Sequence, residues 1–336
     1  MSGAWRAYLP VAVVGLLLAA VPLFAGHSRY LMGLAVGTLV FACYGVGLNV
    51  IFGSTGQLFL CLGALAGMAG YGSAILSDRG GWPLILALPV AAAAAAGLGG
   101  LFSWIAVRRG LDVIFVGIVT LAFSLGFGNL LLGQRDLTGG ETGIVVEAGA
   151  GTFLRGEVPP YYLFLLVLVV FLMGYRGIQR SSMGWAFRAL RDDPEAAELA
   201  GIDVARYRIR AGLIGSAMVG LAGGLYAHVE GFVSPTTYAF QHVDVRTLVV
   251  LAFGGIGSLL GPIVGAVAFG VLDELLRGLG QLRTAVYGVA LIALFLGFRS
   301  GVVPVVSGMA RKLHRRRPAP ARPARRPAMH RRRRPG

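Results

Sequence analysis

Long apolar stretches, separated by short polar segments, occupy almost the whole chain. A helix needs about 20 apolar residues to cross the hydrocarbon core of a bilayer. The stretches that approach or reach this length are residues 8–25, 30–52, 57–77, 83–107, 111–133, 161–178, 208–232, 247–272 and 284–306. The pattern predicts an all-α fold, a polytopic transmembrane helical bundle with about 8–10 membrane segments.

The composition supports lipid as the solvent. Hydrophobic residues make up 56% of the chain and charged residues 13%, whereas a soluble domain carries about 25% charged residues. We therefore expect one membrane domain over residues 1–310. The only cysteines, Cys43 and Cys61, lie inside apolar stretches, which argues against a disulfide framework and against a metal site.

Much of the net charge of +15 lies beyond residue 310, in a segment of Arg, Pro and Ala. This composition predicts a disordered, basic, cytoplasmic tail over residues 311–336, in contact with membrane lipid. No folded nucleic-acid-binding module accompanies the tail, so we expect no nucleic acid partner.

The arginines also predict the orientation. Cytoplasmic loops are rich in Arg and Lys, and arginines gather at Arg108 and Arg109, between residues 176 and 210, and in the tail. Both termini are therefore predicted to be cytoplasmic, with the first apolar stretch retained as a helix. This arrangement requires an even number of crossings, which the apolar stretches do not supply.

The stretch at 247–272 is the one that we expect not to cross, because proline and glycine interrupt it. We predict two half-helices that re-enter the membrane from outside and turn near residues 257–262. The alternative is a missed or an additional span elsewhere. The hinge residues predicted here are Gly254, Gly255, Gly257, Gly261 and Pro262.

The hydrophilic segment at 179–207 carries the most specific signal. Asp193 suits a helix N-cap, Pro194 the first helical position and Glu195 the positive helix end. Helix-favouring Ala196 and Ala197 follow, and Gly201 ends the pattern. We predict a helix of about two turns with a face of small residues that fits a cleft in a partner protein; an ordinary surface loop is the alternative.

This segment resembles the cytoplasmic Glu-Ala-Ala loop of ABC importer permeases, through Glu195-Ala196-Ala197 and Gly201. The preceding residues narrow the resemblance to the LivM branch of branched-chain amino-acid permeases: Gly184-Trp185-Ala186-Phe187-Arg188-Ala189-Leu190-Arg191. Segments at 48–58, 109–123, 137–140, 221–227 and 254–262 are similar to the same branch, so the resemblance covers roughly residues 35–300.

The resemblance implies a division of labour among subunits. The short helix would be the coupling helix that docks on one of two ATP-binding cassette subunits, where ATP and Mg would bind. A second homologous permease subunit and an extracytoplasmic substrate-binding protein would complete an importer in the cell membrane of a prokaryote. The sequence agrees, because it has no phosphate-binding loop and its only lysine is Lys312. We expect no catalytic residue and no cofactor bound by this chain.

A translocation pathway needs polar groups within the apolar stretches. The candidates are Asn49, Thr55, Gln57, Thr120 and Asn129. Hydrogen bonding between helices is the alternative role for each of them.

The other charged residues receive simpler interpretations. We expect Asp244 and Arg246 to form a pair on the outer surface, although the family usually has an uncharged segment there. His228, Glu230 and His242 are expected at the outer end of the seventh stretch, as a docking surface. The run from Phe59 to Gly63 also departs from the family's usual Ser-Leu-Gly-His type of sequence, which leaves the substrate less certain than the family.

Three other functions compete with amino-acid import. A permease for urea or a short-chain amide shares these motifs. A secondary transporter driven by ions would need ionisable residues at mid-membrane depth, and no clear carboxylate lies in the interior of the first six stretches. A membrane enzyme would need a catalytic constellation, such as clustered histidines or paired carboxylates, which the sequence does not display.

Overall fold

The computed structural model describes residues 2–26, 28–146, 156, 158–276, 278 and 289. The elements, in chain order, are α1 (Ser2–Ala19), α2 (Val21–Ala25), α3 (Arg29–Leu48), the π-helical turn η1 (Asn49–Gly53), α4 (Leu62–Asp78), α5 (Leu84–Arg108), α6 (Val113–Gly133), α7 (Arg135–Thr138), η2 (Gly140–Thr142), β1 (Ile144–Val145), α8 (Val158–Arg180), α9 (Ser182–Asp192), α10 (Pro194–Leu199), α11 (Val204–Glu230), β2 (Phe232–Val233), α12 (Phe240–Gly254) and α13 (Gly261–Leu276). The all-α prediction is confirmed. Apart from residue 289, the predicted span at 284–306 lies outside the described residues, as does the tail at 311–336.

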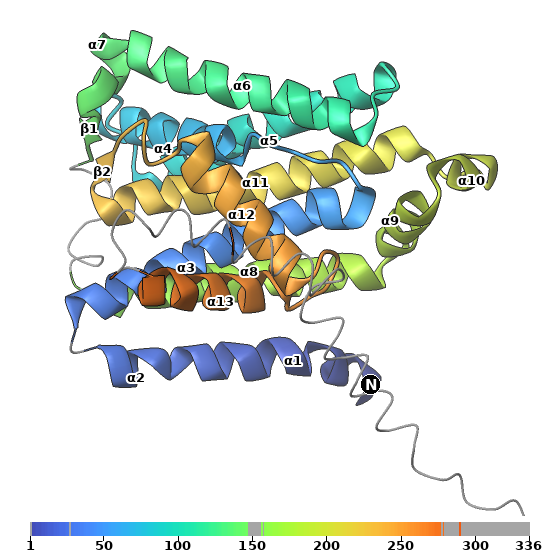
Figure 1. The fold of residues 1–336 in the computed structure, drawn as a ribbon, viewed down its shortest axis with the longest axis horizontal. Coiled ribbons are helices and arrows are strands. Elements are labelled where there is room, and N and C mark those ends of the chain that lie inside the picture. The colour runs from blue at the N-terminus through green and yellow to red at the C-terminus, as the bar shows by residue number, and fades with distance from the viewer. Residues whose placement is uncertain are drawn as a thin grey trace, which may run out of the picture.

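The long helices run side by side, parallel or antiparallel, and α12 crosses them obliquely (Figure 1). Helix α11 lies at the centre and packs against α3, α4 and α5. Glycines permit this close packing: a Cβ atom at Gly47 of α3 would lie 2.9 Å from the carbonyl oxygen of Gly215 in α11. Small residues of this kind bring helix backbones together in membrane bundles.

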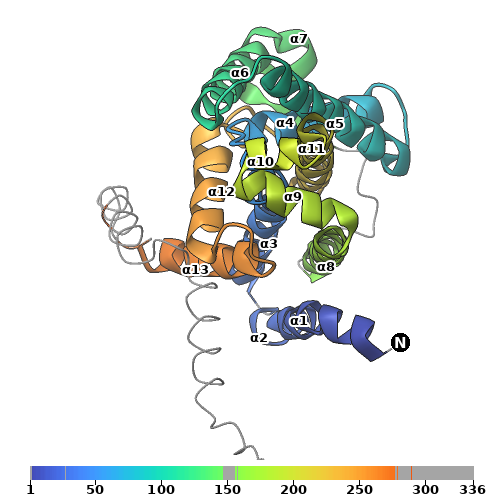
Figure 2. The ribbon, with the colours of Figure 1, turned by 90° about the vertical axis from the view of Figure 1, so that its right-hand side faces the viewer.

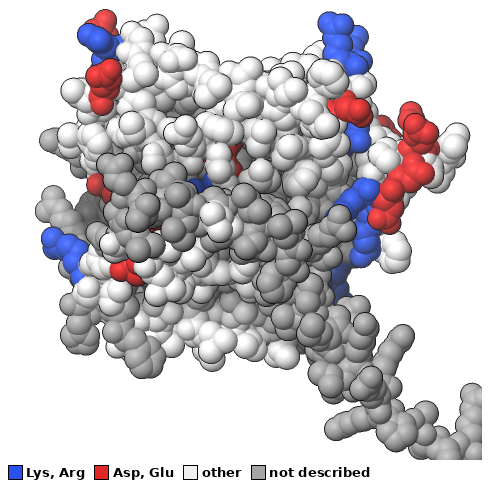
Figure 3. Space-filling view, viewed as in Figure 1, with Lys and Arg blue, Asp and Glu red and all other residues white. Residues whose placement is uncertain are grey.

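The bundle has two distinct ends. At one end lie α7 and the two-residue antiparallel strands β1 and β2, which pair Ile144 with Val233. At the other end, α9 and α10 lie across the ends of the long helices, as Figure 2 shows face-on. We refer to these as the β1–β2 end and the α9–α10 end. On the face drawn in Figure 3, charged residues gather mainly at the two ends, and the described surface between them shows only small charged spots near its centre.

Five described helices are long and apolar enough to cross a membrane: Arg29–Gly53, Leu84–Arg108, Val113–Gly133, Val158–Arg180 and Val204–Glu230. The stretch predicted at 57–77 was placed too early, because α4 begins only at Leu62. Gly56 adopts a left-handed φ of +74°, and the Leu60 N–H donates to the hydroxyl of Thr120 at 2.9 Å. Residues 56–61 therefore form an irregular segment, and a neighbouring helix accepts the hydrogen bond of one of its amides.

The stretch at 247–272 belongs to two helices. Helices α12 and α13 form a hairpin whose turn, residues 255–260, lies near the α9–α10 end (Figure 1). Both helices are shorter than a full span, at 15 and 16 residues. Whether this hairpin re-enters the membrane from outside remains a prediction.

Candidate functional site

The short helix α10 is built by its local sequence. The carboxylate of Asp193 accepts hydrogen bonds from the N–H groups of Glu195 and Ala196, at 3.0 and 3.1 Å, which is N-capping. At the other end, Gly201 has a φ of +82°, and the Ile202 N–H donates to the Ala197 carbonyl at 3.0 Å. Such a left-handed cap is where glycine is preferred.

Helix α10 presents most of its residues to solvent. Ala197 is buried beneath the helix, while Glu195, Ala196 and Glu198 are exposed and Leu199 is 91% exposed. The face that α10 exposes is small and combines two glutamates with Ala196 and Leu199.

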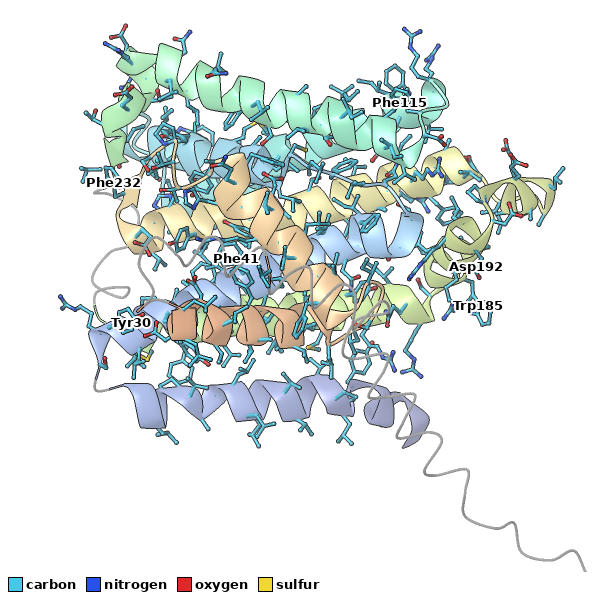
Figure 4. The ribbon with its side chains drawn as sticks, viewed as in Figure 1. Tyr30, Phe41, Phe115, Trp185, Asp192 and Phe232 are labelled. Atoms are coloured by element: carbon cyan, nitrogen blue, oxygen red, sulfur yellow. The ribbon has the colours of Figure 1, made fainter. Side chains whose placement is uncertain are left out.

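Helix α9 anchors α10 to the bundle. It is amphipathic and buries Gly184, Ala186, Phe187 and Leu190. The ring of Phe187 meets that of Tyr207, at the start of α11, edge to face with centroids 6.1 Å apart. On the outer side, Trp185 is exposed, and the guanidinium carbon of Arg188 lies 4.4 Å from the centre of its ring. Figure 4 shows Trp185 pointing away from the bundle.

Arg191, at the end of α9, reaches back into the bundle. Its guanidinium donates a hydrogen bond to the Gly53 carbonyl at 3.0 Å, at the end of the π-helical turn. The same group lies against Gly257, so closely that a methyl group on Gly257 would clash with it. Arg191 therefore connects α9 to two other elements at once, the end of α3 and the turn of the α12–α13 hairpin.

Gly257 is the point where these elements meet. Its N–H donates to the side-chain oxygen of Asn49 at 2.7 Å, and the Asn49 amide donates to the Ser258 carbonyl at 2.8 Å. The Gly257 carbonyl accepts hydrogen bonds from Tyr175 at 3.3 Å and Gln179 at 3.4 Å, both on α8. A cleft of about 230 Å³ lies among these residues. We call the group Asn49, Gly53, Tyr175, Gln179, Arg191 and Gly257 the turn cluster.

The structure thus brings one pathway candidate, Asn49, and one hinge candidate, Gly257, into direct contact. Sequence reasoning does not identify Tyr175 or Gln179, since a polar residue near the end of a helix is ordinary. Arg191 belongs to the segment that resembles the permease family. Its positive charge by itself predicts only that this segment is cytoplasmic.

The other pathway candidates do not share a site. The Thr55 hydroxyl donates to the Ile51 carbonyl within its own segment, Gln57 accepts from Ser103 at 3.1 Å, and Thr120 holds the Leu60 amide. These three side chains are buried, whereas Asn129 is exposed on the surface of α6. The hydrogen bonds of Thr120 and Gln57 fit the alternative role of joining packed segments.

The expected surface pair of Asp244 and Arg246 is wrong. Asp244 is 1% exposed, and its carboxylate accepts hydrogen bonds from the N–H groups of Leu62 and Gly63, the latter at 3.1 Å. A carboxylate is favourable there because the first amides of α4 have no partner within their own helix and carry a partial positive charge. Asp244 therefore ties α12 to the start of α4.

The prediction that His228, Glu230 and His242 form a docking surface is also wrong for His228. His228 is buried, and its Nε2 atom lies 3.1 Å from the Ser73 hydroxyl of α4. Glu230 and His242 are exposed. Among the described residues, no group of three His, Cys, Asp or Glu side chains is placed to hold a metal ion.

Comparisons with known proteins agree on one family. The model of the family described as "Branched-chain amino acid transport system / permease component" matches residues 30–298. The chain is 30% identical over 304 residues to the high-affinity branched-chain amino acid transport system permease protein LivM of Escherichia coli (strain K12), which covers 83% of this chain and 71% of that protein. No solved structure matches the chain.

Two further relatives show which other permeases the chain is similar to. The fructose import permease protein FrcC of Rhizobium meliloti is 37% identical over 124 residues, which cover 36% of this chain and 34% of FrcC. The probable branched-chain amino acid transport permease protein LivH of Methanocaldococcus jannaschii is 24% identical over 264 residues, 75% of this chain and 81% of LivH. The similarity that spans most of this chain is to proteins named for branched-chain amino acids.

Proposed function

The chain belongs to the family of permease components of branched-chain amino acid transport systems, and from this premise we propose that it carries branched-chain or related hydrophobic amino acids inward as part of an ABC importer. The observation that carries the proposal is the capped, solvent-facing helix α10 together with the contact of α9 with the turn cluster. Through this arrangement, a partner protein that displaces α10 also displaces residues inside the bundle.

The driving force comes from separate subunits. Two ATP-binding cassette subunits bind ATP and Mg and dock on α10, and a second homologous permease completes the membrane part. An extracytoplasmic binding protein delivers the substrate. The α9–α10 end therefore faces the cytoplasm of a prokaryotic cell, and the β1–β2 end faces outward.

In the proposed mechanism, closure of the ATPase subunits displaces α10 and, with it, α9. Arg191 passes the displacement to the end of α3 and to the hairpin turn, because it contacts both. The transporter then alternates between states open to opposite sides, and ATP biases the equilibrium between them.

The experiment is ATP-dependent uptake of labelled leucine into proteoliposomes that contain the chain with its ATPase, second permease and binding protein. Unlabelled valine, urea, fructose and ribose serve as competitors. Competition by valine alone supports the proposal. Competition by urea favours the short-chain amide alternative, and uptake driven by an ion gradient without ATP would favour a secondary transporter.

A further inference from the structure

Arg246 lies at an unexpected depth. Its guanidinium carbon is 6.0 Å from the centre of the Phe41 ring, and Phe41 is near the middle of the span Arg29–Gly53. Figure 4 shows Phe41 between Tyr30, toward the β1–β2 end, and Trp185, at the α9–α10 end, and nearer to Tyr30. Arg246 is half-buried, and its contact with Phe41 places its charge beside the middle of a membrane-spanning helix and not at the end of the bundle.

No described carboxylate forms an ion pair with Arg246. Asp244, two residues away, is held by the amides at the start of α4. Within the described part of the chain, Arg246 forms no ion pair or hydrogen bond with another side chain, and the sequence contains no Asp or Glu after Glu274. An unpaired charge at this depth is costly, so intramembrane arginines mark ion or substrate pathways.

A cleft of about 320 Å³ adjoins Arg246, within the roughly 300–1,000 Å³ of small-molecule sites. It runs along α3 between α11, α12 and the segment after β2. Its lining combines three aromatic rings with polar side chains. The residues that define the cleft for this argument are Phe41, Tyr44, Tyr226, Thr236, His242 and Arg246.

We propose that this cleft binds the carboxylate of a translocated solute, with Arg246 as the residue that recognises it. A guanidinium can bind a carboxylate through two parallel hydrogen bonds. The rings of Phe41, Tyr44 and Tyr226 then receive the aliphatic side chain, or face the ammonium group through a cation–π contact. That the solute is an amino acid rests on the proposed function; the carboxylate specificity rests on the cleft itself.

The chemistry separates amino acids from the competing substrate class. Urea and short-chain amides are neutral and gain no ion pair from Arg246. A carboxylate that loses its charge-assisted hydrogen bonds should bind about tenfold more weakly or worse. The proposal therefore predicts discrimination between leucine and leucinamide, which differ only at the carboxyl group.

The test is saturation-transfer NMR of leucine with the complete importer in nanodiscs, without the binding protein, so that only the membrane site is observed. We expect leucine, but not leucinamide, to give a signal, and Arg246→Gln to weaken leucine binding about tenfold. Arg246→Lys should restore part of it, because the charge remains. Arg135→Gln, at the exposed β1–β2 end, is the matched control and should bind leucine normally.

The outcomes distinguish the two proposals. Equal signals from leucine and leucinamide, or undiminished binding by Arg246→Gln, would overturn the carboxylate site even if leucine uptake is confirmed. If other carboxylates bind through Arg246 while leucine does not, the site stands and the proposed substrate is wrong. An unchanged elution volume and an unchanged far-UV circular dichroism spectrum show that the variants are folded.

Discussion

At the scale of single residues, Gly257 is the most constrained position of the turn cluster. It has a left-handed φ of +79°, donates to Asn49 and accepts from α8. A side chain there meets two obstacles, because L-residues pay roughly 1–2 kcal/mol in this backbone region and the Arg191 guanidinium occupies the space.

We therefore predict that Gly257→Ala displaces Arg191 and uncouples ATP hydrolysis from uptake. The expected result is roughly a fivefold or greater rise in ATP hydrolysed per leucine transported, measured in proteoliposomes. Gly128→Ala, on α6, is the control because a Cβ atom there meets nothing within 4 Å. An unchanged ratio for Gly257→Ala would show that the turn cluster does not transmit the motion.

Asp244 supports a second prediction at this scale. Asp244→Asn removes the charge that faces the first amides of α4, and charge-assisted hydrogen bonds of this kind contribute about 1.5–3 kcal/mol. We expect the thermal unfolding midpoint in detergent to fall by several degrees. Asp112→Asn should leave it nearly unchanged, because Asp112 is exposed and makes no capping hydrogen bond at the start of α6. Equal midpoints for both variants would contradict the role of Asp244.

At the scale of elements, the helix α10 is a separable unit. Its start and end depend on residues within the segment, so its fold can be perturbed without touching the bundle core. Gly201→Val places a β-branched residue at a φ of +82°, a backbone conformation that glycine adopts without strain and valine does not. Glu195→Arg instead reverses the charge on an exposed site.

Both substitutions should uncouple ATP hydrolysis from uptake without preventing membrane insertion. Gly201→Val distorts the end of α10, and Glu195→Arg reverses the charge that α10 presents to the partner surface. Uptake per ATP should fall at least fivefold in each case, while the amount of protein in the membrane remains normal. Glu141→Arg, exposed near the β1–β2 end, provides the charge-reversal control, and normal uptake by both test variants would remove the coupling role of α10.

The elements differ in how far the sequence predicts them. The cap, proline and glycine of α10 act within a few residues, so local chemistry is enough to predict it. The start of α4 differs from the prediction because residues 58–61 are apolar and continuous with the helix that follows, yet the Leu60 amide donates to Thr120 of α6 instead of to a helical carbonyl. The burial of Asp244 depends on the amides at that helix start, which lie about 180 residues earlier in the chain, so no local pattern predicts it.

The turn cluster is hidden from the sequence for a related reason. Asn49 and Gly257 are 208 residues apart in the chain, and no periodicity links them. Glycine and proline in the stretch 247–272 indicate a break, but which helix end receives the turn is decided by packing. The contacts of Arg246 with Phe41 likewise require α12 to be placed against α3.

At the scale of the whole molecule, the hairpin decides the topology. Helix α12 leaves the β1–β2 end and α13 returns toward it, where Glu274 accepts a hydrogen bond from Tyr30 at the start of α3. The hairpin therefore does not change the side on which the chain emerges. This geometry is compatible with the predicted cytoplasmic termini only if a further crossing follows residue 276.

Accessibility of engineered cysteines to a membrane-impermeant maleimide tests this topology in intact cells. Cys43 and Cys61, both buried, are first replaced by alanine. We expect Leu275→Cys, at the exposed end of α13, to react from outside like Glu141→Cys. Leu199→Cys, on α10, should react only after the cytoplasmic side is opened. Reaction of Leu275→Cys together with Leu199→Cys would mean that the hairpin crosses the membrane, because α13 would then end on the α10 side.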